Sequence, residues 1–80
     1  MRLHYSFQAV KLLRTLGSEG VGLRRTIESL LNNPIPDDVL VSKARPGRYE
    51  LFHFGYWIVY EIDQSGAETI IRVTAIEENR

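Results

Sequence analysis

The chain has 80 residues, of which 44% are hydrophobic and 25% are charged. This composition is typical of one small globular domain over residues 1–80 and not of a disordered chain. The chain contains no cysteine, which excludes a disulfide framework, a thiolate metal site and a cysteine nucleophile. No apolar run approaches the roughly 20 residues that a membrane span needs, and the first residues lack the long apolar stretch of a signal peptide. We therefore expect a cytoplasmic protein without a membrane partner.

The formal net charge is zero, but the charges are distributed unevenly along the chain. Residues 1–48 hold eight Lys or Arg and four Asp or Glu, which gives +4, whereas residues 49–80 hold two and six, which gives −4. A basic half of this kind suits contact with nucleic acid or with an acidic protein. It is equally what an ordinary solvated surface carries, and both interpretations stay open.

The first half of the sequence predicts two helices. Ser6 is a suitable N-cap for the first, whose apolar residues recur at helical spacing until Gly17 can end it. Ser18 is a candidate cap for the second helix, in which residues 23–31 form an apolar stripe and residues 32–34 end the pattern. The short break between the two stripes predicts an antiparallel helical hairpin.

Apolar and β-branched runs bounded by turn residues predict five strands. Their ranges are 3–5, 39–42, 49–54, 56–62 and 69–76. The order is thus β-α-α-β-β-β-β, which favours an α+β fold. In this fold the N-terminal strand and an antiparallel helical hairpin pack on one face of a mainly antiparallel sheet.

Side-chain alternation in the two central strands predicts which face of the sheet stays open. Glu50 and Glu61 mark one face as the solvent side, so the helices should cover the other. By the same alternation the open face carries four apolar residues, which we expect to bind a partner protein or a second copy of the chain: Phe52, Phe54, Trp57 and Val59. A register shifted by one residue would instead bury them in the core.

Other kinds of chemistry find little support in the sequence. His4 and His53 lie far apart and show no ligand spacing, so we expect no metal site and no cofactor. The glycines at 17, 20 and 22 follow a helix instead of a strand and lack the rest of a phosphate-loop pattern. The tyrosines at 49, 56 and 60 should face the helices, which favours core packing over acid–base chemistry.

Residues 47–63 resemble the central hairpin of the RelE/ParE toxins of type II toxin–antitoxin systems. The closest part of the match is Ile58-Val59-Tyr60-Glu61-Ile62-Asp63. Further motifs resemble the family's first helix, the end of its second helix and its last strand, and these are Phe7-Gln8-Ala9 with Leu13 and Leu16, Ile27-x-x-Leu30-x-x-Asn33-Pro34, and Ile71-x-Val73-x-Ala75-Ile76. The resemblance spans nearly the whole chain and depends on the order and spacing of these motifs together.

The resemblance implies a toxin that a small cognate antitoxin neutralises. RelE-type members of the family bind the ribosome and cut mRNA, and ParE-type members are described as inhibitors of DNA gyrase. The chain departs from the RelE pattern where the hairpin should carry arginines that hold the scissile phosphate, because it has Glu50, Phe52 and Trp57 there. A carboxylate repels phosphate and aromatic rings cannot neutralise it, so we do not expect an RNA-cutting enzyme.

Some basic residues nevertheless remain at positions that the resemblance links to RNA. A loop holds Lys43, Arg45 and Arg48 where RelE-type members carry RNA-binding lysines, and Arg80 stands where the family's catalytic C-terminal segment would begin. These four residues are candidate nucleic-acid contacts. We therefore expect a toxin-like protein that acts mainly by protein binding. The alternatives are a ribosome-dependent mRNA endoribonuclease and a degenerate, non-toxic family member that serves as an interaction module.

Overall fold

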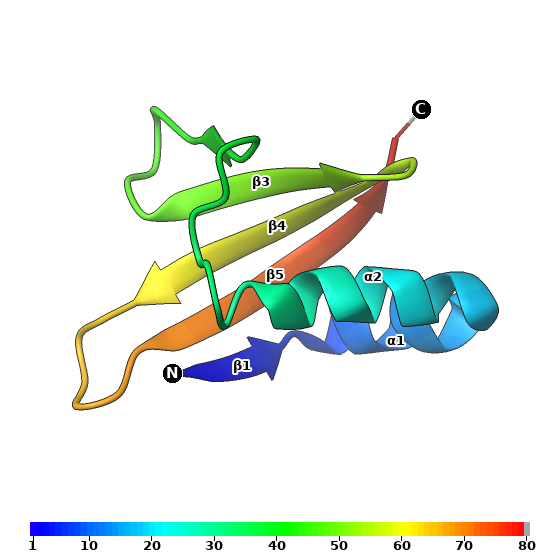
Figure 1. Cartoon of the computed structure of the whole chain (residues 1–80), viewed down its shortest axis with the longest axis horizontal. Helices are drawn as coiled ribbons and strands as arrows, with labels where there is room; N and C mark the ends of the chain where they lie inside the picture. Colours follow the sequence, from blue (N-terminus) through cyan, green and yellow to red (C-terminus); the bar gives the residue numbers. More distant parts are fainter. Residues whose placement is uncertain (80) are drawn as a thin grey trace.

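The computed structural model describes residues 1–79 and has the element order expected from the sequence. Its helices and strands are β1 (Arg2–Tyr5), α1 (Phe7–Leu16), α2 (Ser18–Ser29), β2 (Leu40–Val41), β3 (Arg48–His53), β4 (Tyr56–Asp63) and β5 (Ile70–Glu78). Figure 1 shows α1 and α2 side by side against the strands. The predicted α+β fold is confirmed. Neither of the two helices in residues 1–79 is long and apolar enough to cross a membrane.

The five strands form one mixed sheet in the order β1-β5-β4-β3-β2. The pairs β2–β3, β3–β4 and β4–β5 are antiparallel, whereas β1 pairs with β5 in parallel, with Arg2 opposite Ile70. The helical hairpin leads from β1 to β2 at the opposite edge, and the antiparallel strands β2, β3 and β4 then bring the chain back to β5 beside β1. The first strand thus rejoins the sheet beside the last strand, at the edge opposite β2 (Figure 1).

The ends of α1 follow the signals in the sequence. The hydroxyl of Ser6 accepts a hydrogen bond from the backbone N–H of Ala9 at 3.1 Å, and Gly17 ends the helix with a positive φ of 61°. The prediction that Ser18 caps α2 is wrong, because Ser18 is already the first helical residue and Gly17 occupies the cap position without a side-chain bond. One glycine therefore ends the first helix and begins the second.

Gly20 has a packing role that its place in a helix did not suggest. It is buried, and a Cβ atom built on it would lie 2.6 Å from the backbone oxygen of Leu13 in α1. Backbone cannot yield to such a contact in the way that a flexible side chain can. The missing side chain therefore lets the two helices approach closely, and the helix propensity lost at this position is offset by packing.

The core lies between the helical hairpin and one face of the sheet. Its largest fully buried side chains there are Tyr60, Leu23, Ile27, Leu30, Ile58, Ile71, Ile76 and Val73. The hydroxyl of Tyr60 donates a hydrogen bond of 2.7 Å to the carbonyl of Pro34, and its ring stacks on that of Tyr49 with 5.4 Å between centroids. Burial raises the pKa of Tyr60 to about 12, so this phenol is a neutral core group, as the sequence predicted.

Gln8 fastens the start of α1 to the end of the sheet. Its side-chain amide donates to the carbonyl of Ile76 at 2.9 Å, and its carbonyl oxygen accepts from the N–H of Ile76 at 3.0 Å. The paired segment of β1 ends at Tyr5, opposite Val73, so the glutamine takes over as hydrogen-bond partner where the strand stops. This satisfies a backbone donor and acceptor that would otherwise lack a strand.

Candidate functional site

Two aromatic rings lie side by side on the face of the sheet that the helices leave open. Phe52 on β3 is paired in register with Trp57 on β4, and their rings meet edge to face with 5.0 Å between centroids. Phe52 is 43% exposed, while Trp57 is half-buried and donates its indole N–H to the side-chain oxygen of Asn79 at 3.2 Å. We call Phe52 and Trp57 the aromatic patch. Its geometry suits a protein interface, where a rigid aromatic pair presents apolar area at little entropic cost.

Val59 lies farther along the same face but offers almost no surface. It pairs with Glu50 on β3 and Ala75 on β5, and only 2% of it is exposed. It stands outside the main core cluster, so its neighbours on the open face enclose it. The expectation that Val59 is part of an exposed apolar surface is therefore wrong, because its side chain is buried.

Phe54 does not lie on the open face, which corrects another expectation. Strand β3 ends at His53, and Phe54 and Gly55 form a two-residue turn in which both have a positive φ, 41° and 90°. Positive φ at both central residues is the signature of a type I′ hairpin turn. The turn removes Phe54 from the strand alternation, and its ring packs edge-on against His53 with 4.7 Å between centroids. Phe54 is 87% exposed at the tip of the hairpin.

The rest of the open face is occupied by opposite charges that compensate one another. In register across β3, β4 and β5 run Arg48, Glu61 and Arg72. Arg72 donates to the carboxylate of Asp63 at 3.1 Å, and Arg48 lies 3.9 Å from that of Glu50. Hydrogen bonds from Ser65, and then from Arg72, lower the pKa of Asp63 to about 2. We call this region the charged half of the open face.

The basic loop predicted to contact nucleic acid is partly neutralised by this charged half. The guanidinium of Arg45 lies 3.9 Å from the carboxylate of Glu61, and that of Arg48 faces Glu50. Lys43 is exposed and has no ion pair within residues 1–79. Arg80, the fourth candidate, lies outside the described residues. The loop thus presents one uncompensated cation among the described residues, which is a weak basis for holding a phosphate backbone.

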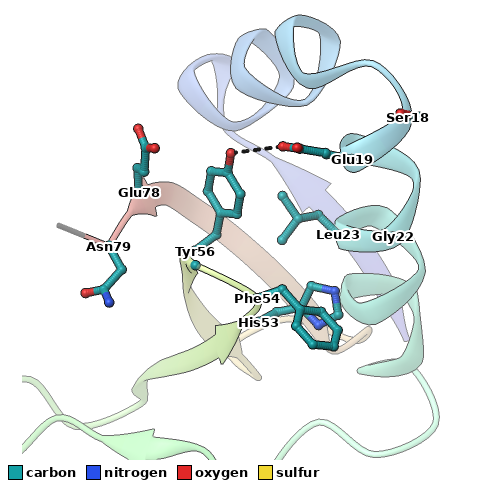
Figure 2. Close-up of a pocket in the computed structure, with 10 residues that line it drawn as sticks. Ser18, Glu19, Gly22, Leu23, His53, Phe54, Tyr56, Glu78 and Asn79 are labelled. Carbon is teal, nitrogen blue, oxygen red and sulfur yellow. Dashed lines mark hydrogen bonds between the residues drawn. The ribbon is translucent and has the colours of Figure 1, made fainter.

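A cavity that sequence reasoning did not foresee opens beside the tip of the hairpin. It has a volume of about 620 Å³ between the first turns of α2 and the β3–β4 turn. Figure 2 shows the ring of Tyr56 standing between Glu78 on β5 and Glu19 on α2, and its hydroxyl donates to Glu19 at 3.3 Å. The residues that line the cavity come from segments remote in sequence, so no local motif could have predicted it.

The two histidines occupy unrelated places in the fold. His4 is exposed on β1. His53 lies under α2, where the hydroxyl of Thr26 is 3.1 Å from its Nδ1. No group of three or more His, Asp or Glu side chains within the described part of the chain is placed to hold a metal ion.

Comparisons with known proteins add no name to this site. No family model, no curated protein and no solved structure matches the chain.

Proposed function

We propose that the protein is a toxin-like component of a type II toxin–antitoxin pair, that it acts by binding protein, and that a cognate antitoxin neutralises it. The first support is the position of the motifs that resemble the RelE/ParE family. They fall on α1, the end of α2, the β3–β4 hairpin and β5, in the order that the resemblance implies.

The observation that carries the proposal is the aromatic patch. It occupies hairpin positions where the resemblance implies phosphate-binding arginines, and it replaces them with exposed apolar area, 43% of Phe52 included. Aromatic residues of this kind are enriched in the centres of protein interfaces. The same substitution removes the cations that would stabilise a transition state at phosphate. A surface altered in this way favours protein binding over RNA cleavage.

The charges around the patch support the same choice. Glu50 is one of the three residues that replace the expected arginines. Its carboxylate lies 3.9 Å from the guanidinium of Arg48, so it repels a phosphate and also pairs with the nearest cation. Glu61 does the same for Arg45. An RNA backbone approaching this loop would meet two carboxylates near two of its three cations, and their charge would weaken its attraction to the loop.

Growth of bacteria that express the chain alone tests the toxic activity. We expect induction to arrest growth, and we expect co-expression of the cognate antitoxin to restore it. Normal growth with soluble, folded protein would contradict the toxin assignment and leave a non-toxic interaction module. Arrest accompanied by cuts in ribosome-bound mRNA, lost in a K43A/R45A/R48A variant, would support the ribonuclease alternative instead.

A second experiment tests the surface. The double variant F52S/W57S should weaken the complex with the neutralising protein by at least about tenfold, because the aromatic pair is lost from the interface centre. The matched control is F7S, which removes an equally apolar and more exposed side chain from α1. Both variants should keep the circular-dichroism spectrum of the wild type. Equal affinity for wild type and F52S/W57S would show that the patch is not the binding surface.

A further inference from the structure

The cavity beside the hairpin tip has the size of a ligand site, and its walls combine apolar side chains with two carboxylates. Its volume of about 620 Å³ falls within the range of about 300–1,000 Å³ that small-molecule pockets occupy. The apolar part of the wall comes from Leu23 on α2 and from the rings of Phe54 and Tyr56 (Figure 2). None of these apolar groups is part of the aromatic patch, so the cavity is a separate site.

Two carboxylates give the cavity a negative charge that nothing in the described residues neutralises. Glu19 and Glu78 both belong to its lining, neither forms an ion pair within residues 1–79, and no Lys or Arg among those residues lines it. Partial desolvation and then the nearness of Glu19 and Glu78 raise the pKa of the Tyr56 hydroxyl. Glu19 accepts a hydrogen bond from the Tyr56 hydroxyl, and Glu78 is the cross-strand neighbour of Tyr56, so a positive group beside this tyrosine would be attracted by both carboxylates.

The space in the cavity is kept open by a glycine. A Cβ atom on Gly22 would meet only the Nε2 of His53, at 3.8 Å, which is an ordinary van der Waals separation. Gly22 is therefore not required for helix packing in the way that Gly20 is. Its missing side chain leaves room between α2 and the hairpin tip, next to Leu23 and the ring of Phe54.

We propose that this cavity binds an organic cation, an ammonium or guanidinium group carried on a short aliphatic chain. The cation would lie against the ring of Tyr56, which has Glu78 on one side and Glu19 on the other, so cation–π attraction would add to the attraction of the two carboxylates. The aliphatic chain would contact Leu23 and Phe54. A divalent metal fits less well, because such ions take more oxygen ligands than two carboxylates and a phenol supply. The inference is independent of the toxin-like function.

The chemistry of the ligand is tested with a charged probe and its neutral counterpart. Full-length protein labelled with ¹⁵N is titrated with n-butylamine, protonated at pH 7, and with n-butanol. We expect butylammonium to shift the amide signals of Gly22, Gly55 and Asn79 and to bind about tenfold more tightly than butanol. A capped Gly-Lys-Gly peptide is titrated in parallel. Stronger binding of the peptide would identify a partner's side chain as the source of the cation, and stronger binding of the amine a free metabolite.

Variants locate the site and keep the test decisive. The double variant E19Q/E78Q keeps the shape of the cavity and removes its charge, so butylammonium should bind no better than butanol. E28Q is the matched control, because Glu28 is on the same helix but outside the lining. Wild type and both variants are also measured with the additional substitution R80A. Arg80 directly follows Asn79 in the sequence and has the same charge as butylammonium, so its removal excludes competition between the two cations. Equal binding of amine and alcohol in wild type and R80A, or an equal loss in E28Q, would overturn the proposal.

Discussion

On the helix-covered face of the sheet, β3, β4 and β5 bury apolar side chains and one neutral phenol, whereas the open face of the same strands mixes two aromatic rings with ion pairs. Ile58 is fully buried on the first face, while its neighbour Trp57 is half-buried on the second. The three departures from the RelE pattern, Glu50, Phe52 and Trp57, all lie on the open face. The comparison teaches that the fold is held mainly from one side, so the other side can change its chemistry at little cost in stability.

The largest expected effect comes from substituting matched positions on the two faces. I58A should lower the free energy of unfolding by about 2–5 kcal/mol, because a fully buried Ile leaves a cavity. F52A should lower it by no more than about 1.5 kcal/mol, the value of an exposed aromatic pair. Urea denaturation of both variants measures the difference. A larger loss in F52A than in I58A would break the distinction between a stabilising face and a binding face.

Two glycines of α2 sharpen the comparison within the helical layer itself. G20A should destabilise the protein by about 1–3 kcal/mol, because its Cβ would lie 2.6 Å from the backbone oxygen of Leu13. G22A should instead stabilise it by up to about 1 kcal/mol, since alanine favours a helix and the new methyl group meets nothing closer than 3.8 Å. Thermal melts of the pair measure both signs. Equal melting temperatures would mean that the helices do not need the close approach at Gly20.

Y60F tests the fully buried phenol of the covered face. The variant leaves the carbonyl of Pro34 without its 2.7 Å hydrogen bond, which should cost about 1 kcal/mol at pH 7. In the wild type the folded pKa of about 12 exceeds the ordinary 10.0. The contribution of the phenol is thus fully present below pH 10 and is lost as pH rises towards 12. Y60F should not lose stability between pH 10 and 12 in this way, and a pH titration should no longer show the rise in tyrosinate absorbance near pH 12. If Y60F keeps that rise, the rise belongs to another tyrosine.

D63N gives the smallest expected effect and concerns the charged half of the open face. The folded pKa of about 2 lies below the ordinary 3.8, so the ionised carboxylate stabilises the protein above about pH 4. That contribution is lost as pH falls through 2. D63N should be slightly less stable than wild type at pH 7 and should match it near pH 2. Parallel denaturation curves at the two pH values measure this, and a constant gap between the two proteins would disprove the assignment.

The sequence predicted those parts of the fold that depend on local signals. Ser6 and Gly17 fixed the first helix because a cap and a left-handed residue act within one turn of chain. Alternation placed Tyr60 and Ile58 in the core because charged residues marked the opposite face. These signals need only a few neighbouring residues, and the element order followed from them.

The parts that the sequence did not reveal depend on contacts between distant segments. Phe54 was assigned to a strand because an aromatic residue rarely adopts a positive φ, yet the hairpin needs two residues for its turn. Val59 was expected to be exposed because alternation gives a face but not the degree of enclosure. Glu19 and Glu78 meet around one cavity only after α2 and β5 are packed, so no spacing in the chain could have paired them.

The parallel pairing of β1 with β5 affects how the protein folds while it is being synthesised on the ribosome. The partner of β1 is synthesised more than 60 residues after it, since Arg2 pairs with Ile70 and Tyr5 with Val73. Until that segment emerges, both the edge of β1 and the apolar side of the helical hairpin remain uncovered, and they are open to chaperones and proteases. Closing so long a loop also makes folding slow for the length of the chain. The sheet therefore acquires its β1–β5 pairing only after β5 has left the ribosome.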